Sequence, residues 1–406
     1  MATSGAHIEA ALRRTMVGQL ETWGADTGIA LDPAVLDAML LVSRAHFTRG
    51  AAPEDAYDAH AAIVTKRDPA GLAISSVSAP TIVAMMVTQL AVRPGHRVLE
   101  IGSGGYNAAL LRELVGPSGQ VTTLDVDPDV ATGALERLRS AGYEDVEVRF
   151  ADGEFGAPDR ALFDRIVVTV EAADVPPAWV GQLRPGGRLV VPLRMCGLTR
   201  SVAFTDVEGV LVSSGYELCG FVPMQGAGEH REQRVPLAEG VELRLDDGQR
   251  ADGEALRSAL AGSRAEVGTG LRVANQEPFT EHLDLWLATM LPGFGLLTAG
   301  AAAVDRGLVN PAWPGGRTPA ITRGGTLAYR SWRRFDGGAE VRVTAHGPDA
   351  ADVAAEFAQA HRVWAGTRRP GSPARIAVYP AGTPDAELPA GYRLDRRHSR
   401  TVITWS

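Results

Sequence analysis

Three acidic residues in the first half of the chain stand at positions where a carboxylate could bind a charged small molecule. Glu100 ends a short apolar segment and leads into a glycine-rich turn, and Asp125 and Asp152 end the next two apolar segments. Glycine lets the backbone approach a ligand closely, and the helix that follows such a turn begins with unpaired N–H groups. The pattern predicts a small-molecule site around this turn.

The chemistry of these residues favours one class of cofactor. The turn reads GSGG rather than the GxGxxG of dinucleotide enzymes,. An acid at the end of the second strand, here Asp125, can accept hydrogen bonds from both hydroxyls of a ribose. Three carboxylates would repel a pyrophosphate but attract a sulfonium and an ammonium group, so we predict S-adenosylmethionine. The predicted cofactor-binding residues are Glu100, Gly102, Ser103, Gly104, Asp125, Asp152 and Gly153.

The elements that must position these residues alternate between strand and helix. Apolar segments typical of buried strands span 96–102, 120–126, 146–153, 163–170 and 183–193. Helical patterns separate the first three of them. This alternation predicts an α/β fold with a doubly wound parallel sheet, of the Rossmann-like class I methyltransferase type. Residues 201–214 and 217–224 are expected to add an antiparallel pair to that sheet.

We predict three regions in the chain. Residues 1–79 form an N-terminal helical region that ends in a loop over 67–79, and residues 80–230 form the cofactor-binding domain. Residues 231–406 form a C-terminal α+β domain for substrate recognition, because proline- and glycine-rich stretches there separate short elements. A helix is expected over 348–366,.

The bulk composition bounds the possible functions. The 406 residues are 45% hydrophobic and 22% charged, as in soluble globular proteins, and the formal charge is −8,. An acidic chain argues against a nucleic-acid partner. No apolar run reaches the roughly 18 residues that a membrane span needs, and no secretory signal is visible. Two cysteines without CxxC spacing and histidines without metal-ligand spacing predict a cytoplasmic, metal-free protein.

The order of the motifs resembles a known family. The segments LLVSRAHFTRG, ISSVSAPTIVAMM, RVLEIGSGGYNAALL, LDVDPDV, ADGEFG, FDRIVVTVEAADVPP and LRPGGRLVVPL together resemble the protein-L-isoaspartate O-methyltransferases over about residues 12–195. The GSGGYNAALL turn and the long C-terminal extension are similar to the subgroup that modifies ribosomally made peptides, including lanthipeptide-associated and FxLD-system methyltransferases. The resemblance implies methyl transfer to a peptide carboxylate.

The resemblance also assigns a role to the serine-rich segment before the first strand. Ser78 matches a family serine that lies beside the acceptor carboxylate, although the segment reads SVSAPT where the family usually has T-I-S-x-P followed by His. A carboxylate is already nucleophilic, so its methylation needs alignment and hydroxyl donors rather than a strong base. We predict Ser78 and Ser76 as catalytic and Ser75 and Thr81 as substrate-binding. The alternative is that the serines cap the next helix.

The extension motivates the leading functional hypothesis. We predict esterification of an aspartate side chain in a modified precursor peptide, with a succinimide and then isoaspartate as products. The runner-up is general isoaspartyl repair, and a third hypothesis is a peptide-binding protein without turnover. Residues 361–406 hold eight arginines against three acids and could dock an acidic peptide, or could simply be a solvated face. The arginines are Arg362, Arg368, Arg369, Arg375, Arg393, Arg396, Arg397 and Arg400.

Overall fold

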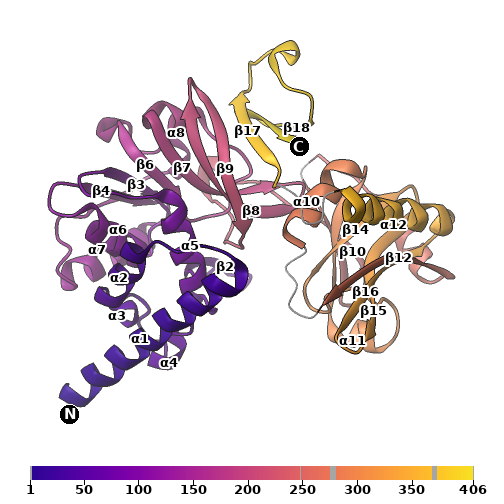
Figure 1. Cartoon of the computed structure of the whole chain (residues 1–406), viewed down its shortest axis with the longest axis horizontal. Coiled ribbons are helices and arrows are strands. Elements are labelled where there is room, and N and C mark those ends of the chain that lie inside the picture. Colours follow the sequence, from indigo (N-terminus) through magenta and orange to yellow (C-terminus); the bar gives the residue numbers. More distant parts are fainter. Residues whose placement is uncertain (1, 247, 275–279, 368–372, 406) are drawn as a thin grey trace.

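The chain folds into two lobes around two large sheets (Figure 1). The structure, a computed structural model, describes residues 2–246, 248–274, 280–367 and 373–405. The first lobe contains the N-terminal helices and a ten-stranded sheet, and the second contains a seven-stranded sheet. No described helix is long and apolar enough to cross a membrane.

The ten-stranded sheet has the order β18-β19-β17-β9-β8-β7-β6-β3-β4-β5. Its strands are β3 (Arg97–Ile101), β4 (Gln120–Asp125), β5 (Glu147–Phe150), β6 (Phe163–Val168), β7 (Leu183–Met195), β8 (Leu198–Val207), β9 (Val210–Leu218), β17 (Arg375–Pro380), β18 (Tyr392–Asp395) and β19 (Ser399–Thr404). The pairs from β5 to β7 are parallel, and the remaining pairs are antiparallel. The predicted doubly wound parallel sheet is therefore confirmed.

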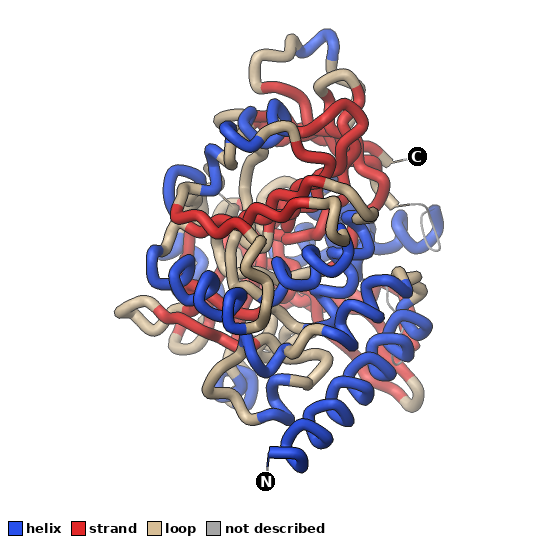
Figure 2. Tube along the Cα trace, turned by 90° about the vertical axis from the view of Figure 1, so that its left-hand side faces the viewer, coloured by secondary structure: helices blue, strands red, loops and turns tan. Residues whose placement is uncertain are grey.

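The parallel strands have apolar side chains on both faces, so other elements pack against both faces of the sheet. On β3, Val98 packs into one core with α5 and α6, and Leu99 packs into the opposite core with Trp179 of α8. The helices of this lobe are α1 (Ala2–Thr27), α2 (Pro33–Leu41), α3 (Arg44–Phe47), α4 (Pro53–Ala56), α5 (Pro80–Leu90), α6 (Tyr106–Val115), α7 (Pro128–Ser140) and α8 (Pro177–Gln182). Figure 2 shows α1 as a long helix at the N-terminal end of the chain.

The segment expected as a loop over 67–79 is instead mostly a β-hairpin. Strand β1 (Ile63–Arg67) pairs antiparallel with β2 (Ala73–Val77). The hairpin was missed because its strands are short and only partly buried, so they lack the apolar alternation that marks a strand,.

The antiparallel addition to the sheet also differs from the prediction. Both of its strands lie within 198–218, where Glu208 and Gly209 have φ values of 54° and 85° and form a two-residue turn between β8 and β9,. Residues 219–224 are not a strand; only Pro223 forms an isolated bridge, with Glu171. This segment instead passes along the candidate site.

The second lobe is a seven-stranded antiparallel sheet with helices packed against it. Its strands are β10 (Gln233–Ala238), β11 (Val241–Leu245), β12 (Arg264–Ala274), β13 (Phe294–Ala299), β14 (Arg317–Arg323), β15 (Thr326–Phe335) and β16 (Gly338–His346). Its helices are α9 (Gly253–Leu260), α10 (Thr280–Met290), α11 (Ala301–Asp305) and α12 (Ala350–Thr367). Helix α12 confirms the predicted helix and packs against β12, β15 and β16 through the buried Val353, Phe357 and Trp364.

The end of the chain returns to the first lobe. Strand β17 pairs with β9, and β19 and β18 follow it, so residues 375–404 extend the ten-stranded sheet instead of joining the C-terminal sheet. This departs from the prediction that residues 231–406 form one unit; the boundaries at 79 and 230 stay predictions. Apolar residues of both lobes form one continuous core, and Trp286 meets Trp405 edge to face at 5.5 Å. Packing of this kind holds the lobes together.

Candidate active site

The three predicted acids lie at one edge of the parallel sheet, because β3, β4 and β5 are adjacent and run in the same direction. Glu100, at the end of β3, is 1% exposed. Its carboxylate accepts hydrogen bonds from Asn107 Nδ2 at 2.8 Å and from Thr123 Oγ1 at 2.6 Å. Burial raises the pKa of Glu100 to about 7, although these two hydrogen bonds oppose the rise,.

Asp125 fastens the glycine-rich turn to β4. Its Oδ2 accepts from the backbone N–H of Ser103 at 2.9 Å, and its Oδ1 accepts from that of Asp127, also at 2.9 Å. Burial raises the pKa of Asp125 despite both hydrogen bonds. Beside it, Lys66 of the hairpin donates to Asp127 and Asp129 at 2.7–2.8 Å. This contact, made by the chain's only lysine, ties the hairpin to the start of α7.

Asp152 and Gly153 follow β5 and begin the short helix Gly153–Phe155. Asp152 accepts from the N–H of Glu154 at 3.0 Å and from that of Ala227 at 2.8 Å, so it also holds the loop after residue 224. The carbonyl of Gly153 accepts from the indole N–H of Trp179 at 2.8 Å. A side chain at Gly153 would come within 2.5 Å of Ile101, which explains the need for glycine.

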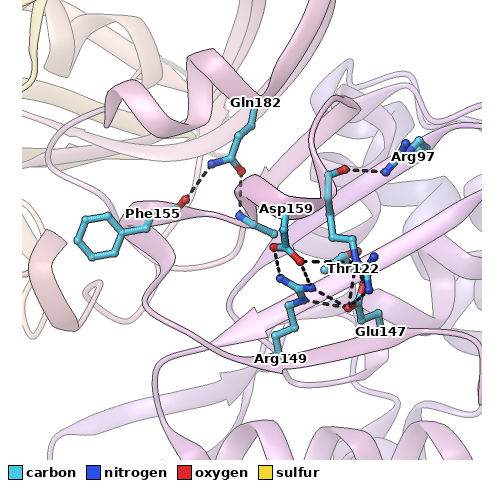
Figure 3. Close-up of polar contacts among 9 residues, drawn as sticks. Arg97, Thr122, Glu147, Arg149, Phe155, Asp159 and Gln182 are labelled. Carbon is cyan, nitrogen blue, oxygen red and sulfur yellow. Dashed lines mark hydrogen bonds and ion pairs between the residues drawn. The ribbon is translucent and has the colours of Figure 1, made fainter.

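A polar network supports this corner of the sheet (Figure 3). Arg149 makes a bidentate contact with Asp159 at 2.6 Å and contacts Glu147 at 2.9 Å. Gln182 accepts from Ala157 N–H and donates to the carbonyl of Phe155, both at 2.8 Å. These contacts position the backbone that carries Asp152 and Gly153.

The glycines of the turn serve different purposes. Gly102 has φ 96°, and a Cβ there would lie 2.6 Å from Thr169 Oγ1. Gly105 has φ 87° and would press against Phe47. Gly104 has neither constraint, since the nearest atom to an added Cβ is 3.7 Å away in Val77. The backbone conformation of the turn and its close neighbours therefore require glycine at positions 102 and 105. Gly104, by contrast, borders open space.

A small cavity of about 40 Å³ lies between this turn, the hairpin and α5. Ser76 and Ser78 line it together with Glu100 and Gly104. Its remaining lining residues are Val77, Val83, Met86, Tyr106, Asn107, Val167, Thr169 and Phe221. Asn107, Thr169 and Phe221 were not predicted, because nothing in their local sequence marks them as polar or apolar partners of the turn.

The predicted acceptor residues do not all reach the cavity. Ser78 does not cap α5, whose N-cap residue Ala79 makes no side-chain cap, and the Ser78 hydroxyl bonds to no described residue. Ser75 faces away, where its Oγ accepts from Thr65 at 2.9 Å, because successive side chains of a strand point to opposite faces,. Thr81 is buried in the first turn of α5 and lines neither this cavity nor the groove described next.

A much larger groove, of about 1260 Å³, opens between the two lobes and shares Ser76, Ser78 and Phe221 with the cavity. The hairpin, the β7–β8 turn and residues 219–232 contribute to it from the first lobe, and α10, β10, β11, β13 and β14 from the second. The groove and the cavity therefore meet at these three residues.

The C-terminal arginines proposed for docking lie elsewhere. Those that the structure describes do not line the groove. Arg396 pairs with Asp246 at 2.7 Å, and Arg400 pairs with Asp385 and Asp395. Arg368 and Arg369 lie outside the described residues. The segment was read as a basic face because its acidic partners, such as Asp246, are distant in sequence.

The glycine-rich turn and the strand ends beside it have features that suit S-adenosylmethionine, although Ser103 and Asp125 do not themselves line the cavity. The Oγ of Ser103 and the hydroxyl of Tyr106 are buried without a partner among the described residues. Two of the carboxylates, Glu100 and Asp125, have raised pKa values, and a nearby sulfonium or ammonium group would favour their charged forms,. We therefore regard Ser103, Glu100 and Asp125 as fitting this cofactor.

Comparison with known proteins decides the family. The family model for protein-L-isoaspartate(D-aspartate) O-methyltransferase matches residues 16–229, more than half of the chain. The chain belongs to this family. It is thus an S-adenosylmethionine-dependent carboxyl methyltransferase, and the predicted enzyme class, cofactor and family are confirmed. The peptide-tailoring subgroup within this family stays a prediction.

Individual relatives and a solved structure are also similar to the chain. A protein-L-isoaspartate O-methyltransferase of Methanopyrus kandleri is 40% identical over 195 residues, which are 47% of this chain and 83% of the relative. One of Methanosarcina mazei is 41% identical over 225 residues, 55% of this chain and 86% of the relative. A solved structure of a protein-L-isoaspartate O-methyltransferase aligns with 86% of this chain and 92% of its own, at 19% identity and a TM-score of 0.49.

Proposed function

We propose that the chain methylates the α-carboxylate of isoaspartyl residues in peptides and proteins. The observation that carries this proposal is the position of Ser78, which borders both the cavity at the glycine-rich turn and the groove between the lobes. Its hydroxyl bonds to no described residue and is available to hold one carboxylate oxygen. The family match and the relatives named for isoaspartate favour this substrate over an ordinary aspartate.

Each residue then has a defined task. Asp125 and Ser103 would hold the ribose side of the cofactor, and the buried Glu100 would complement its positive charge. When bound, S-adenosylmethionine supplies an electrophilic methyl group to the carboxylate oxygen and leaves as S-adenosylhomocysteine. Ser78 and Ser76 would orient the acceptor carboxylate without protonating it. No general base is required, because the carboxylate is ionised at neutral pH.

The test compares two peptides of one sequence, one with isoaspartate and the other with aspartate at the same position. The full chain is incubated with S-adenosylmethionine, and mass spectrometry measures the gain of one methylene unit. We expect methylation of the isoaspartyl peptide alone. The variant Ser75→Ala is a matched control for Ser78→Ala, since Ser75 faces away from the cavity. Equal loss of activity in both variants would contradict the role given to Ser78.

A second candidate is esterification of an aspartate in a ribosomally synthesised precursor peptide, followed by succinimide and isoaspartate formation. The observation favouring it is the second lobe, which lies beyond the family match and borders the groove. The comparisons support the first candidate better. A constrained peptide encoded beside the gene should gain a methylene unit or lose one water if the second candidate holds, and stay unchanged if it does not.

A further inference from the structure

The groove between the lobes contains a charge pattern that the methyl-transfer chemistry does not use. Six arginines line it: Arg194, Arg200, Arg231, Arg234, Arg244 and Arg317. Five acids line it as well: Asp68, Glu171, Glu229, Glu232 and Asp284. The question is which of these charges remain available to a ligand.

The acids are already engaged. Glu232 contacts Arg194 at 3.0 Å, Arg244 at 3.0 Å and Arg234 at 3.5 Å, so three cations share one carboxylate. Glu171 accepts from the Thr199 hydroxyl and lies 3.5 Å from Arg194. Arginines of the protein therefore balance the negative charges of these two buried or nearly buried carboxylates.

The other three acids of the groove also have partners. Asp284 accepts from Arg330, and Asp68 accepts from the N–H of Leu72 at 2.7 Å. Glu229 faces Arg231 at 3.6 Å. Every acid that lines the groove within the described residues therefore has a partner in the protein.

Arg317 differs from the other arginines. It opens β14, is exposed in the groove, and makes no ion pair or side-chain hydrogen bond with a described residue. Its backbone is fixed, because it pairs with Thr298 of β13 in the seven-stranded sheet. A guanidinium held on a rigid strand at the side of a groove is suited to a planar carboxylate.

We propose that Arg317 binds a second carboxylate of the substrate peptide, distinct from the one that is methylated. The second lobe would then select isoaspartyl peptides that carry an acidic residue at one particular distance from the isoaspartate. This inference rests on the proposed function and specifies its substrate class. Arg317 lies outside residues 16–229, the region that the family model matches.

The test uses isoaspartyl peptides of one length in which a single Asp is moved along the sequence, with an Asn peptide as reference. We measure kcat/KM from S-adenosylhomocysteine formation for the full-length enzyme. At one position Asp should raise kcat/KM roughly tenfold, the size expected of one charge-assisted hydrogen bond. In Arg317→Gln that preference should disappear, and Arg317→Lys should keep part of it.

The matched control is Arg334→Gln, an exposed arginine on β15 that does not line the groove. Arg334→Gln should keep the wild-type preference for Asp at that position. Added salt should weaken this preference in the wild type and in Arg334→Gln alike. An unchanged preference in Arg317→Gln, or equal rates for all peptides with the wild type, overturns the inference while leaving the proposed function intact. Failure to methylate any isoaspartyl peptide would overturn both.

Discussion

The buried carboxyl of Glu100 should make the folded protein less stable as the pH rises toward neutrality. The side chain is 1% exposed, and burial raises its pKa to about 7, against its hydrogen bonds from Thr123 and Asn107. In the unfolded chain the same carboxyl has the ordinary value of 4.5. The folded state therefore keeps its proton over a pH range in which the unfolded state has lost it.

The size and direction of the effect follow from that difference. Below pH 4.5 both states are protonated, and the stabilisation is fully present. Between pH 4.5 and about 7 the unfolded state is ionised first, so the free energy of unfolding falls, and above pH 7 it levels off,. At about 1.4 kcal/mol per pKa unit the total loss is about 3 kcal/mol.

The variant Glu100→Gln should remove this pH dependence. Its amide oxygen can still accept from Asn107, and its NH₂ group can donate to the hydroxyl of Thr123, which rotates to accept,. Near pH 5 the variant and the wild type should differ little in stability. At pH 8 the variant should be more stable by about 2–3 kcal/mol.

Urea denaturation of the cofactor-free protein between pH 5 and 8.5 measures these differences. The exposed Glu144→Gln is the matched control, because it removes a carboxylate from the same lobe without removing a buried one. Parallel pH profiles for the wild type and Glu100→Gln would refute the reasoning. So would a variant that is less stable than the wild type at pH 8, since the charge of Glu100 would then be stabilising.

Three further results are expected. Ser78→Ala should lower kcat by roughly tenfold or more, as expected for one lost donor to a charged group. Calorimetry should give an unchanged Kd for S-adenosylmethionine. Weaker cofactor binding with a normal kcat would contradict this role of Ser78. Asp125→Ala should weaken S-adenosylmethionine at least about tenfold, because it removes a charged acceptor and frees the Ser103 N–H,; an unchanged Kd would exclude a role at the ribose. Lys66→Gln should speed hydrogen exchange of residues 63–77, because the hairpin loses its contact with Asp127 and Asp129, and unchanged exchange would show that other contacts hold it.

Sequence alone was enough to predict that the three acids lie at one edge of the sheet, while their role in binding the cofactor stays a prediction. Strands β3, β4 and β5 are short apolar segments separated by helices, and parallel strands place their carboxyl ends on one edge. Glu100, Asp125 and Asp152 therefore had to converge once the strands were recognised. Local signals also marked α12, whose apolar residues recur at the helical period.

The acceptor side was decided by tertiary structure. The β1–β2 hairpin turns Ser76 toward the cavity and Ser75 away from it, a difference that depends on strand register and cannot be read from composition,. Asn107 is a partner of Glu100 only because α6 folds back over β3.

The groove between the lobes depends on contacts between residues far apart in the chain. Strand β17 joins β9, and Arg317 lines a groove that also contains Ser76 of β2 and Ser78, which lies between β2 and α5, so neither position follows from a local pattern. Local periodicity specifies which residues form a strand, but pairing between distant strands is set by the packing of the whole core. The sequence alone therefore predicted that the three acids meet at one edge of the sheet, and only the tertiary structure determined which charges line the groove.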